Sequence, residues 1–215
     1  MKTVSVILAR GGSKGIPNKN LVSLRGKPLI SYSINSSIKS SVEETWVCTD
    51  SPEISAFSSS LGVKVLIRPP ELAMDNTPSE AALLFFAENV QFDILVFIQP
   101  TSPLLKSSYI NEGIRLVAEG TYDSVFSAYE EHWLPRWSMN NSPFNWDPRK
   151  RPRRQEVPSL LVENGAFYVT KKSLLLETGL RYGGKIGHVS MKECESVQID
   201  SFNDLEFAER LVSSL

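Results

Sequence analysis

The stretch VSVILARGGSKGIPNKN (residues 4–20) joins an apolar run to a loop rich in glycines and cations. Residues 4–9 are apolar apart from one serine, and a glycine-rich loop follows them, which is typical of a buried parallel strand. Arg10, Lys14 and Lys19 then lie among three glycines and a proline. Because ligands of α/β sheets bind beyond the carboxyl ends of strands, the pattern favours an anion-binding loop. A merely basic, solvated loop is the alternative.

Apolar runs alternate with helical patterns along most of the remaining chain. Strands are predicted at 45–48, 63–67, 94–98, 124–128, 165–170 and 186–191, and helices after Pro28 and at 52–61, 78–90, 110–119 and 203–211. The helix at 78–90 is expected to be strongly amphipathic, because Ala81, Leu84, Phe85 and Glu88 fall on one face at three-to-four spacing. This alternation predicts a three-layer α/β/α sandwich with a mostly parallel, Rossmann-like sheet.

Three unusual segments each follow a predicted strand. They are residues 10–20, residues 68–79 and the QPTSP turn at 99–103. Since the carboxyl ends of parallel strands meet at one edge of a sheet, we expect these segments to share one rim.

Residues 129–161 depart from the alternation of strands and helices. They hold tryptophans, prolines and the basic run RKRPRR (149–154). We predict an arm that leaves the core, with Trp133, Trp137 and Trp146 suited to a partner surface. Packing of these rings within the arm is the alternative, as is a purely solvated role for the basic run.

The composition excludes several classes of protein. Of the 215 residues, 41% are hydrophobic, and the formal net charge is −1. That balance gives no general attraction to nucleic acid or membranes. There is no apolar stretch of ~18 residues and no signal-peptide pattern. Two widely spaced cysteines, Cys48 and Cys194, predict a reduced cytoplasmic protein, and two histidines are too few for a histidine-based metal site.

The loop matches neither a Walker loop nor the dinucleotide fingerprint, because its glycines have the wrong spacing. It resembles instead the signature of the cytidylyltransferases that activate sialic and related nonulosonic acids. That likeness lies in ARGGSK (9–14), Lys19-Asn20 and GKPL (26–29). It continues through RPPELA (68–73) with Asp75 and Ser79, QPTSP (99–103), ENGA (163–166) and Ile199-Asp200, and so spans nearly the whole chain.

The resemblance implies a CTP-dependent transferase of the nucleotide-diphospho-sugar transferase fold, with one domain over 1–215. A sugar hydroxyl attacks the α-phosphorus of CTP and pyrophosphate leaves, so catalysis is mostly positioning and electrostatic stabilisation. Arg10, Lys14 and Lys19 would contact the phosphates. The residues implied beside CTP are Ala9, Gly11, Gly12, Ser13, Asn20, Arg68, Asp75 and Ser79. For Ser79, simple capping of the following helix is the alternative.

The same resemblance implies the partners and the metal. The acidic nine-carbon sugar would meet Gln99, Thr101, Ser102, Arg154, Gln155 and Asn164, and the arm would form a homodimer. The implied role is in cell-surface polysaccharide biosynthesis. Relatives commonly carry Asp-x-Asp before the last helix to hold Mg²⁺, whereas this chain has Gln198-Ile199-Asp200.

Asp200 is therefore expected to be the main Mg²⁺ ligand, with Gln198 as a weaker partner on the same face of a strand. Capping of the last helix is the alternative for Asp200. Gln198 also motivates a rival function, a catalytically weak nucleotide-binding subunit or regulator. A cytidylyltransferase for a Kdo-like sugar is less favoured, because those relatives have a different first-loop pattern.

Overall fold

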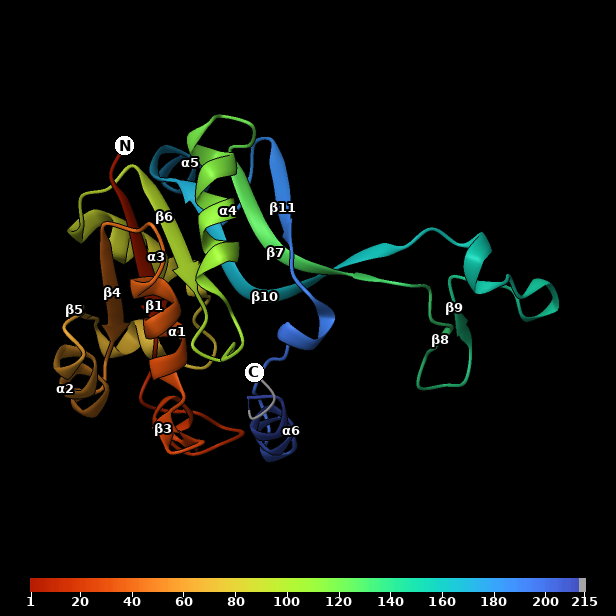
Figure 1. Cartoon of the computed structure of the whole chain (residues 1–215), viewed down its shortest axis with the longest axis horizontal. Helices are drawn as coiled ribbons and strands as arrows, with labels where there is room; N and C mark the ends of the chain where they lie inside the picture. Colours follow the sequence, from red (N-terminus) through yellow and green to blue (C-terminus); the bar gives the residue numbers. More distant parts are fainter. Residues whose placement is uncertain (213–215) are drawn as a thin grey trace.

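A computed structural model describes residues 1–212, so the last three residues of the predicted domain lie outside the described part. Its central sheet has seven strands in the order β11-β7-β10-β6-β1-β4-β5 (Figure 1). Their bounds are β1 (Thr3–Leu8), β4 (Glu44–Thr49), β5 (Lys64–Ile67), β6 (Ile94–Ile98), β7 (Ser124–Glu131), β10 (Leu160–Lys171) and β11 (Ile186–Ser190). Strand β10 runs antiparallel to β6 and β7, and the other pairings in this sheet are parallel.

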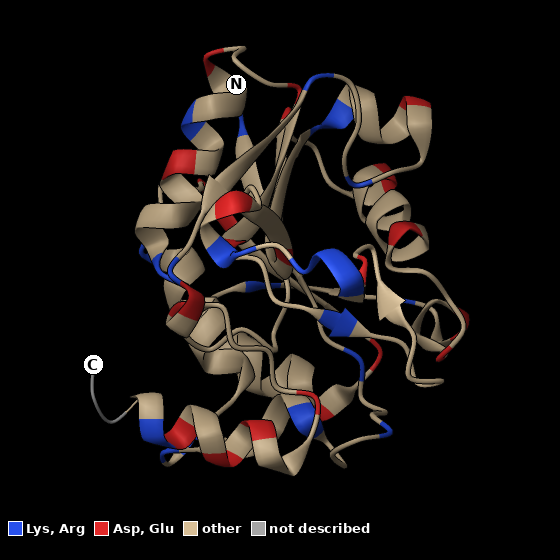
Figure 2. Cartoon of the chain, turned by 90° about the vertical axis from the view of Figure 1, so that its right-hand side faces the viewer, with Lys and Arg blue, Asp and Glu red and all other residues tan. Residues whose placement is uncertain are grey.

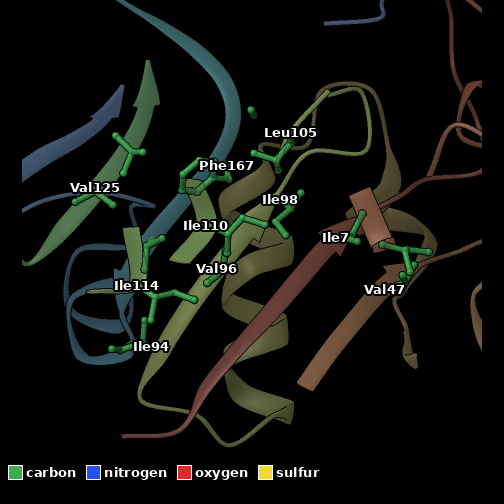
Figure 3. Close-up of a cluster of buried hydrophobic side chains, with 14 of the residues drawn as sticks. Ile7, Val47, Ile94, Val96, Ile98, Leu105, Ile110, Ile114, Val125 and Phe167 are labelled. Carbon is green, nitrogen blue, oxygen red and sulfur yellow. The ribbon is translucent and has the colours of Figure 1, made fainter. Parts of the chain in front are cut away.

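Helices cover both faces of the sheet. On one face pack α1 (Ile30–Ile38), α2 (Pro52–Ser60) and α4 (Ser107–Ala118), and on the other α3 (Ser79–Asn89) and α5 (Lys172–Thr178). Figure 3 shows the first of these interfaces, where Ile110 and Ile114 of α4 meet strand residues such as Val96. The predicted three-layer α/β/α sandwich is thus confirmed. Among residues 1–212, no helix has the length and apolar character needed to cross a membrane.

The last helix, α6 (Phe202–Val212), packs beside the sheet rather than on it. Its Ala208 joins a small apolar cluster with Ile16, Leu24 and Ile199. This cluster holds the loop after β1 against the segment that precedes α6. The two segments come from opposite ends of the chain and carry residues predicted for the site.

The helix predicted to open at Pro28 is α1, and it begins at Ile30. Pro28 therefore lies before the first turn of the helix and not in it. Residues of β2 (Ser23–Leu24) pair with β3 (Lys27–Pro28) in a short hairpin instead. Arg25 and Gly26 have φ angles of 51° and 77°, as a two-residue hairpin turn of the mirror-image type requires. Pro28 therefore closes a hairpin and does not open α1.

The predicted face of α3 is wrong. Its buried residues are Ala82, Leu83, Phe86 and Ala87. The helix is apolar on most of its circumference, so spacing alone could not select the side that packs on the sheet. Helix α5 was not predicted at all, because its seven residues are too short to show a helical period.

The arm begins within the long strands β7 and β10. Residues 129–131 pair only with residues 160–162, beyond the pairs that join β7 to β11 and β10 to β6, and the projection seen in Figure 1 continues from this two-stranded ribbon. It contains the hairpin of β8 (Arg136–Trp137) and β9 (Pro143–Phe144) and the short 3-10 helices Pro148–Lys150 and Arg154–Glu156.

The tryptophans pack partly within the arm. The Trp146 ring lies edge-on to Trp133 and Trp137, with centroids 6.2 and 5.2 Å apart. Trp137 nevertheless stays 55% exposed, and the apolar side chains of Met139 and Phe144 are exposed as well. Figure 2, with the arm toward the viewer, shows Lys and Arg segments gathered there as well.

Candidate functional site

A cavity of about 450 Å³ opens at the carboxyl edge of the sheet. The three segments predicted to share one rim, 10–20, 68–79 and 99–103, all contribute to its lining, as does the segment before α6. Most of the predicted site residues line it, namely Arg10, Ser13, Lys14, Lys19, Asn20, Arg68, Asp75, Ser79, Gln99, Thr101, Gln198 and Asp200. Parallel strands β1, β5 and β6 bring these segments together because all three end at this edge.

The three loop cations face carboxylates from distant parts of the chain. Arg10 Nη1 and Lys14 Nζ both pair with Asp75, the latter at 2.9 Å. Lys19 Nζ lies 2.8 Å from Asp200 Oδ1. Hydrogen bonds from Lys14 and then Arg10 hold the pKa of Asp75 below its ordinary value. The carboxylate is therefore ionised, and an incoming phosphate must compete with it for the two cations.

Two buried polar atoms in this cavity have no hydrogen-bond partner among the described residues. They are Arg68 Nε and Asn20 Oδ1, in side chains of residues only 5% and 4% exposed. Arg68 Nη2 lies 3.9 Å from the Asp50 carboxylate, and burial lowers the pKa of the guanidinium. Both residues line the cavity, so a polar ligand that reaches these two atoms would supply the hydrogen bonds they lack.

The glycines of the loop have different surroundings. The Gly11 amide donates to Asp50 Oδ1 at 3.1 Å, whereas a Cβ on Gly12 would meet open space. A Cβ on Gly15 would lie 2.3 Å from the Asp200 carbonyl oxygen, so only glycine permits this close approach. The spacing of the loop does not predict this role for Gly15. Ala9, Gly11 and Gly12 support the loop without lining the cavity; Ala9 is fully buried.

Neither capping alternative is supported. Pro78 precedes α3 as its N-cap without a side-chain bond, and Ser79 is the first helical residue and lines the cavity. At α6, Ser201 Oγ accepts from the Asp204 amide, and the Asp204 carboxylate accepts from the Ser201 amide at 2.8 Å. This reciprocal pair caps the helix and leaves the Asp200 carboxylate facing Lys19.

The segment that carries Gln198 and Asp200 is not a strand, contrary to the prediction. It is an extended segment whose Ile199 amide donates to the Thr101 carbonyl at 3.0 Å. Both side chains still line the same cavity. The Gln198 amide is engaged by protein groups, because it accepts from Thr101 and donates to Ser102.

The predicted sugar contacts divide into three groups. Gln99 and Thr101 line the cavity, whereas Ser102 and Asn164 are buried beneath it, 1% and 7% exposed. Asn164 Nδ2 donates to Ser196 Oγ at 2.8 Å and so anchors the segment before α6. Arg154 and Gln155 are exposed on the arm and do not line the cavity of their own chain.

Glu195 has a supporting role that the sequence did not reveal. It is 3% exposed, and it accepts from Lys106 Nζ at 2.6 Å and from the Tyr109 hydroxyl at 2.7 Å. Burial by itself would raise the pKa of this carboxyl, but the two hydrogen bonds outweigh it and hold the pKa low. The ion pair ties α4 to the segment that carries Gln198 and Asp200.

Residues 4–213 match the family model described as Cytidylyltransferase. The chain belongs to this family. It is 40% identical to N-acylneuraminate cytidylyltransferase A of Danio rerio over 97% of its own length and 50% of that protein. It is 31% identical to the N-acylneuraminate cytidylyltransferase of Streptococcus agalactiae over 95% of its own length and 52% of that protein. The chain thus spans about half the length of the curated relatives it matches.

Solved structures confirm the fold of this cytidylyltransferase family member. One is CMP:2-keto-3-deoxy-manno-octonic acid synthetase complexed with CTP, with a TM-score of 0.77 and 18% identity. The match covers 100% of this chain and 99% of that one. Another is 4-diphosphocytidyl-2C-methyl-D-erythritol synthase from Anaerococcus prevotii, with a TM-score of 0.70, 10% identity, and 99% and 96% covered.

Asp75→Asn should strengthen anion binding. The substitution removes the counter-charge of Arg10 and Lys14, so the Kd for inorganic pyrophosphate should fall about three- to tenfold. Calorimetric titration measures the change, and Glu88→Gln removes an exposed negative charge outside the cavity lining as a control. Weaker binding by Asp75→Asn would contradict the counter-ion role and favour a direct contact of Asp75 with the nucleotide.

Proposed function

We propose that this chain transfers CMP from CTP to the anomeric hydroxyl of a nonulosonic acid, an acidic nine-carbon sugar, and releases pyrophosphate. The observation that carries the proposal is the set of loop cations beside two orphaned buried polar groups, Arg68 and Asn20, at one edge of the sheet. Family membership and the names of the relatives support the same chemistry. Synthesis of cell-surface polysaccharide in the cytoplasm is the setting that we infer.

The reaction needs no protein nucleophile, because the sugar hydroxyl itself attacks the α-phosphorus. Arg10, Lys14 and Lys19 would exchange their carboxylate partners for the phosphates and offset the charge that spreads over the phosphate oxygens. Lys19 is the most enclosed of the three, with a side chain 17% exposed. Fixed in this way, it presents its charge without reorganisation during the reaction.

Recognition of the nucleotide and of the sugar would fall to buried and partly buried polar groups. Among the described residues, Arg68 Nε is a donor without a partner and Asn20 Oδ1 is an acceptor without one. The donor suits the carbonyl group of cytosine, and the acceptor suits its amino group. Ser79 lies at the same wall of the cavity. Gln99 has both a donor and an acceptor in its amide and suits the N-acyl group of the sugar.

Mg²⁺ fits this cavity only with help from the substrate. Among residues 1–212, no group of three or more His, Cys, Asp or Glu side chains lies together as a metal site. Mg²⁺ commonly takes one or two carboxylates together with substrate phosphates and water. Asp200, with a side chain 75% exposed at the cavity, would supply the carboxylate, and the ion would neutralise phosphate charge.

A second copy of the chain is the partner that we infer for the arm. Leu134, Trp137, Met139 and Phe144 are exposed there, and a twofold pair is the commonest arrangement that covers such a surface. Arg154 and Gln155 project with the arm. In a twofold pair they would meet the sugar carboxylate from the neighbouring subunit, and not in their own chain.

The direct test is pyrophosphate release with CTP, Mg²⁺ and a panel of sugars. The proposal expects release with a sialic, legionaminic or pseudaminic acid. Release with 2-keto-3-deoxy-octonic acid alone would assign the chain to a Kdo-like substrate. CTP binding without release with any of these sugars would overturn the proposal and favour a nucleotide-binding subunit or regulator.

Lys19→Ala should lower kcat/KM by ~100-fold or more, because a fixed cation at a transferring phosphoryl group stabilises the transition state. The unfolding temperature should hardly change, since Lys19 belongs to none of the apolar clusters and its ion pair is with the exposed Asp200. Steady-state kinetics and thermal unfolding measure both, with the exposed Lys39→Ala as the matched control. Activity within a few-fold of the wild type would remove Lys19 from the phosphate site.

Asp200→Asn should abolish turnover and leave the fold intact. The amide keeps the size of the side chain but is a poorer Mg²⁺ ligand than a carboxylate. A Mg²⁺ titration of turnover and a circular dichroism spectrum measure the two effects. Near-normal turnover at the wild-type Mg²⁺ requirement would show that Asp200 serves only to pair with Lys19.

The chain should sediment as a dimer of 24.0 kDa subunits at micromolar concentration. The double variant Met139→Glu, Phe144→Glu should sediment as a monomer, since it places charges on the exposed apolar surface of the arm. Leu61→Glu, on an exposed residue after α2, is the control and should remain dimeric. A wild type that is monomeric by analytical ultracentrifugation would contradict the role of the arm.

A further inference from the structure

The side-chain amide of Gln198 makes three hydrogen bonds. Its Oε1 accepts from Thr101 Oγ1 at 2.6 Å, and its Nε2 donates to Ser102 Oγ at 2.9 Å. Nε2 also donates to the backbone carbonyl of Asn164. The side chain therefore joins the QPTSP turn after β6 to strand β10 and to its own segment.

The third of these bonds requires an amide. A backbone carbonyl only accepts hydrogen bonds, so the group that faces the Asn164 oxygen must be a donor. An ionised carboxylate at position 198 would place oxygen against oxygen there. The Asn164 carbonyl would then lose its partner in a buried place, which is more unfavourable than an ordinary lost hydrogen bond.

The backbone of β10 is shaped to meet this amide. The register between β10 and β7 shifts between Glu163 and Tyr168, which marks a bulge. Gly165 within it has a φ of 68°, a conformation that favours glycine. A Cβ on Gly165 would lie 3.2 Å from Gln198 Nε2, so the glycine also leaves room for the side chain.

The contacts of Gln198 continue to Asp200 through the backbone. The Ile199 amide donates to the Thr101 carbonyl at 3.0 Å, and the Ile199 side chain is fully buried. Ser196, on the other side, is held by Asn164. The position of the Asp200 carboxylate and that of the Thr101-Ser102 turn therefore depend on one set of bonds centred on Gln198.

We propose that Gln198 is a positioning residue and not a metal ligand: its amide locks the Thr101-Ser102 turn and the Asp200 segment onto the β10 bulge, and a carboxylate cannot take its place in this chain. The kinetic part of the inference rests on the proposed function. Its structural part concerns the free protein alone.

The decisive variant is Gln198→Glu, which keeps the size of the side chain and replaces the donor with an acceptor. We expect its unfolding temperature to fall by about 4–8 °C. In kinetics with the sugar that the wild type uses, kcat/KM for the sugar should fall ~30-fold or more, since the turn contributes to the wall that faces the sugar. The Kd for CTP alone should change by less than ~3-fold, and the Mg²⁺ concentration for half-maximal rate should not fall.

Gln91→Glu is the matched control, because it makes the same chemical change at an exposed residue before β6. It should match the wild type in unfolding temperature and kinetics. If Gln198→Glu yields no folded protein, Gln198→Met is tested in its place. We expect Gln198→Met to show the same selective loss of kcat/KM for the sugar. Wild-type kinetics in a folded Gln198→Met would overturn the proposal.

A lower Mg²⁺ requirement with retained turnover in Gln198→Glu would also overturn it, since a metal ligand improves when it becomes a carboxylate. An unchanged unfolding temperature in Gln198→Glu would overturn the proposal as well. If the wild type releases no pyrophosphate with any sugar, the proposed function fails. The positioning role is then decided by the unfolding temperature of Gln198→Glu against Gln91→Glu.

Discussion

Parallel pairing of β1 with both β4 and β6 places the ends of these strands at one edge, with Ile7 opposite Val47 on one side and Ile98 on the other. Each strand is soon followed by a glycine or a proline, Gly11 after β1, Pro52 after β4 and Pro100 after β6, and these residues continue a strand poorly. The loops therefore leave the sheet together and enclose one cavity. Without this register, the cations after β1 and the amides after β6 would not share a site.

Electrostatics in the cavity differ between its surface and its interior. Arg10 and Lys14 form ion pairs with Asp75, and both partners are a third or more exposed. Exposed pairs of this kind contribute little to stability, so a phosphate can replace the carboxylate at small cost. Arg68 is different, because its buried guanidinium lacks a close partner for Nε. Arg10 and Lys14 can therefore exchange Asp75 for a ligand, whereas Arg68 suits a fixed contact.

Among the described residues, the segment before α6 does not pair with the sheet as a strand. The Ile199 amide donates to the Thr101 carbonyl, and buried side chains supply further anchor points. Glu195 is tied to α4 by Lys106 and Tyr109, and Gln198 is tied to the turn after β6 and to β10. Such bonds fix the backbone at a few points and leave the Asp200 carboxylate at the cavity surface. The cavity floor thus depends on buried polar groups whose partners are specific in donor and acceptor character.

Local patterns predict the layers of the fold and the strand ends, because apolar period and glycine-proline boundaries are local signals. Most of the individual residues that line the cavity are named through the resemblance to the cytidylyltransferases. The loop after β1 and the QPTSP turn could be assigned to one rim from strand direction alone. The face of α3, the hairpin that displaces the start of α1, and the ion pairs of Lys14 and Lys19 were decided by the tertiary structure. The ion pairs join residues far apart in the chain, such as Lys19 and Asp200. The buried face of α3 depends on which side of an apolar helix meets the sheet, and the hairpin depends on the positive φ angles of Arg25 and Gly26. The burial of Asn164 and the bonds of Gln198 belong to the same class, because a bulge in β10 sets them and no local spacing encodes their partners.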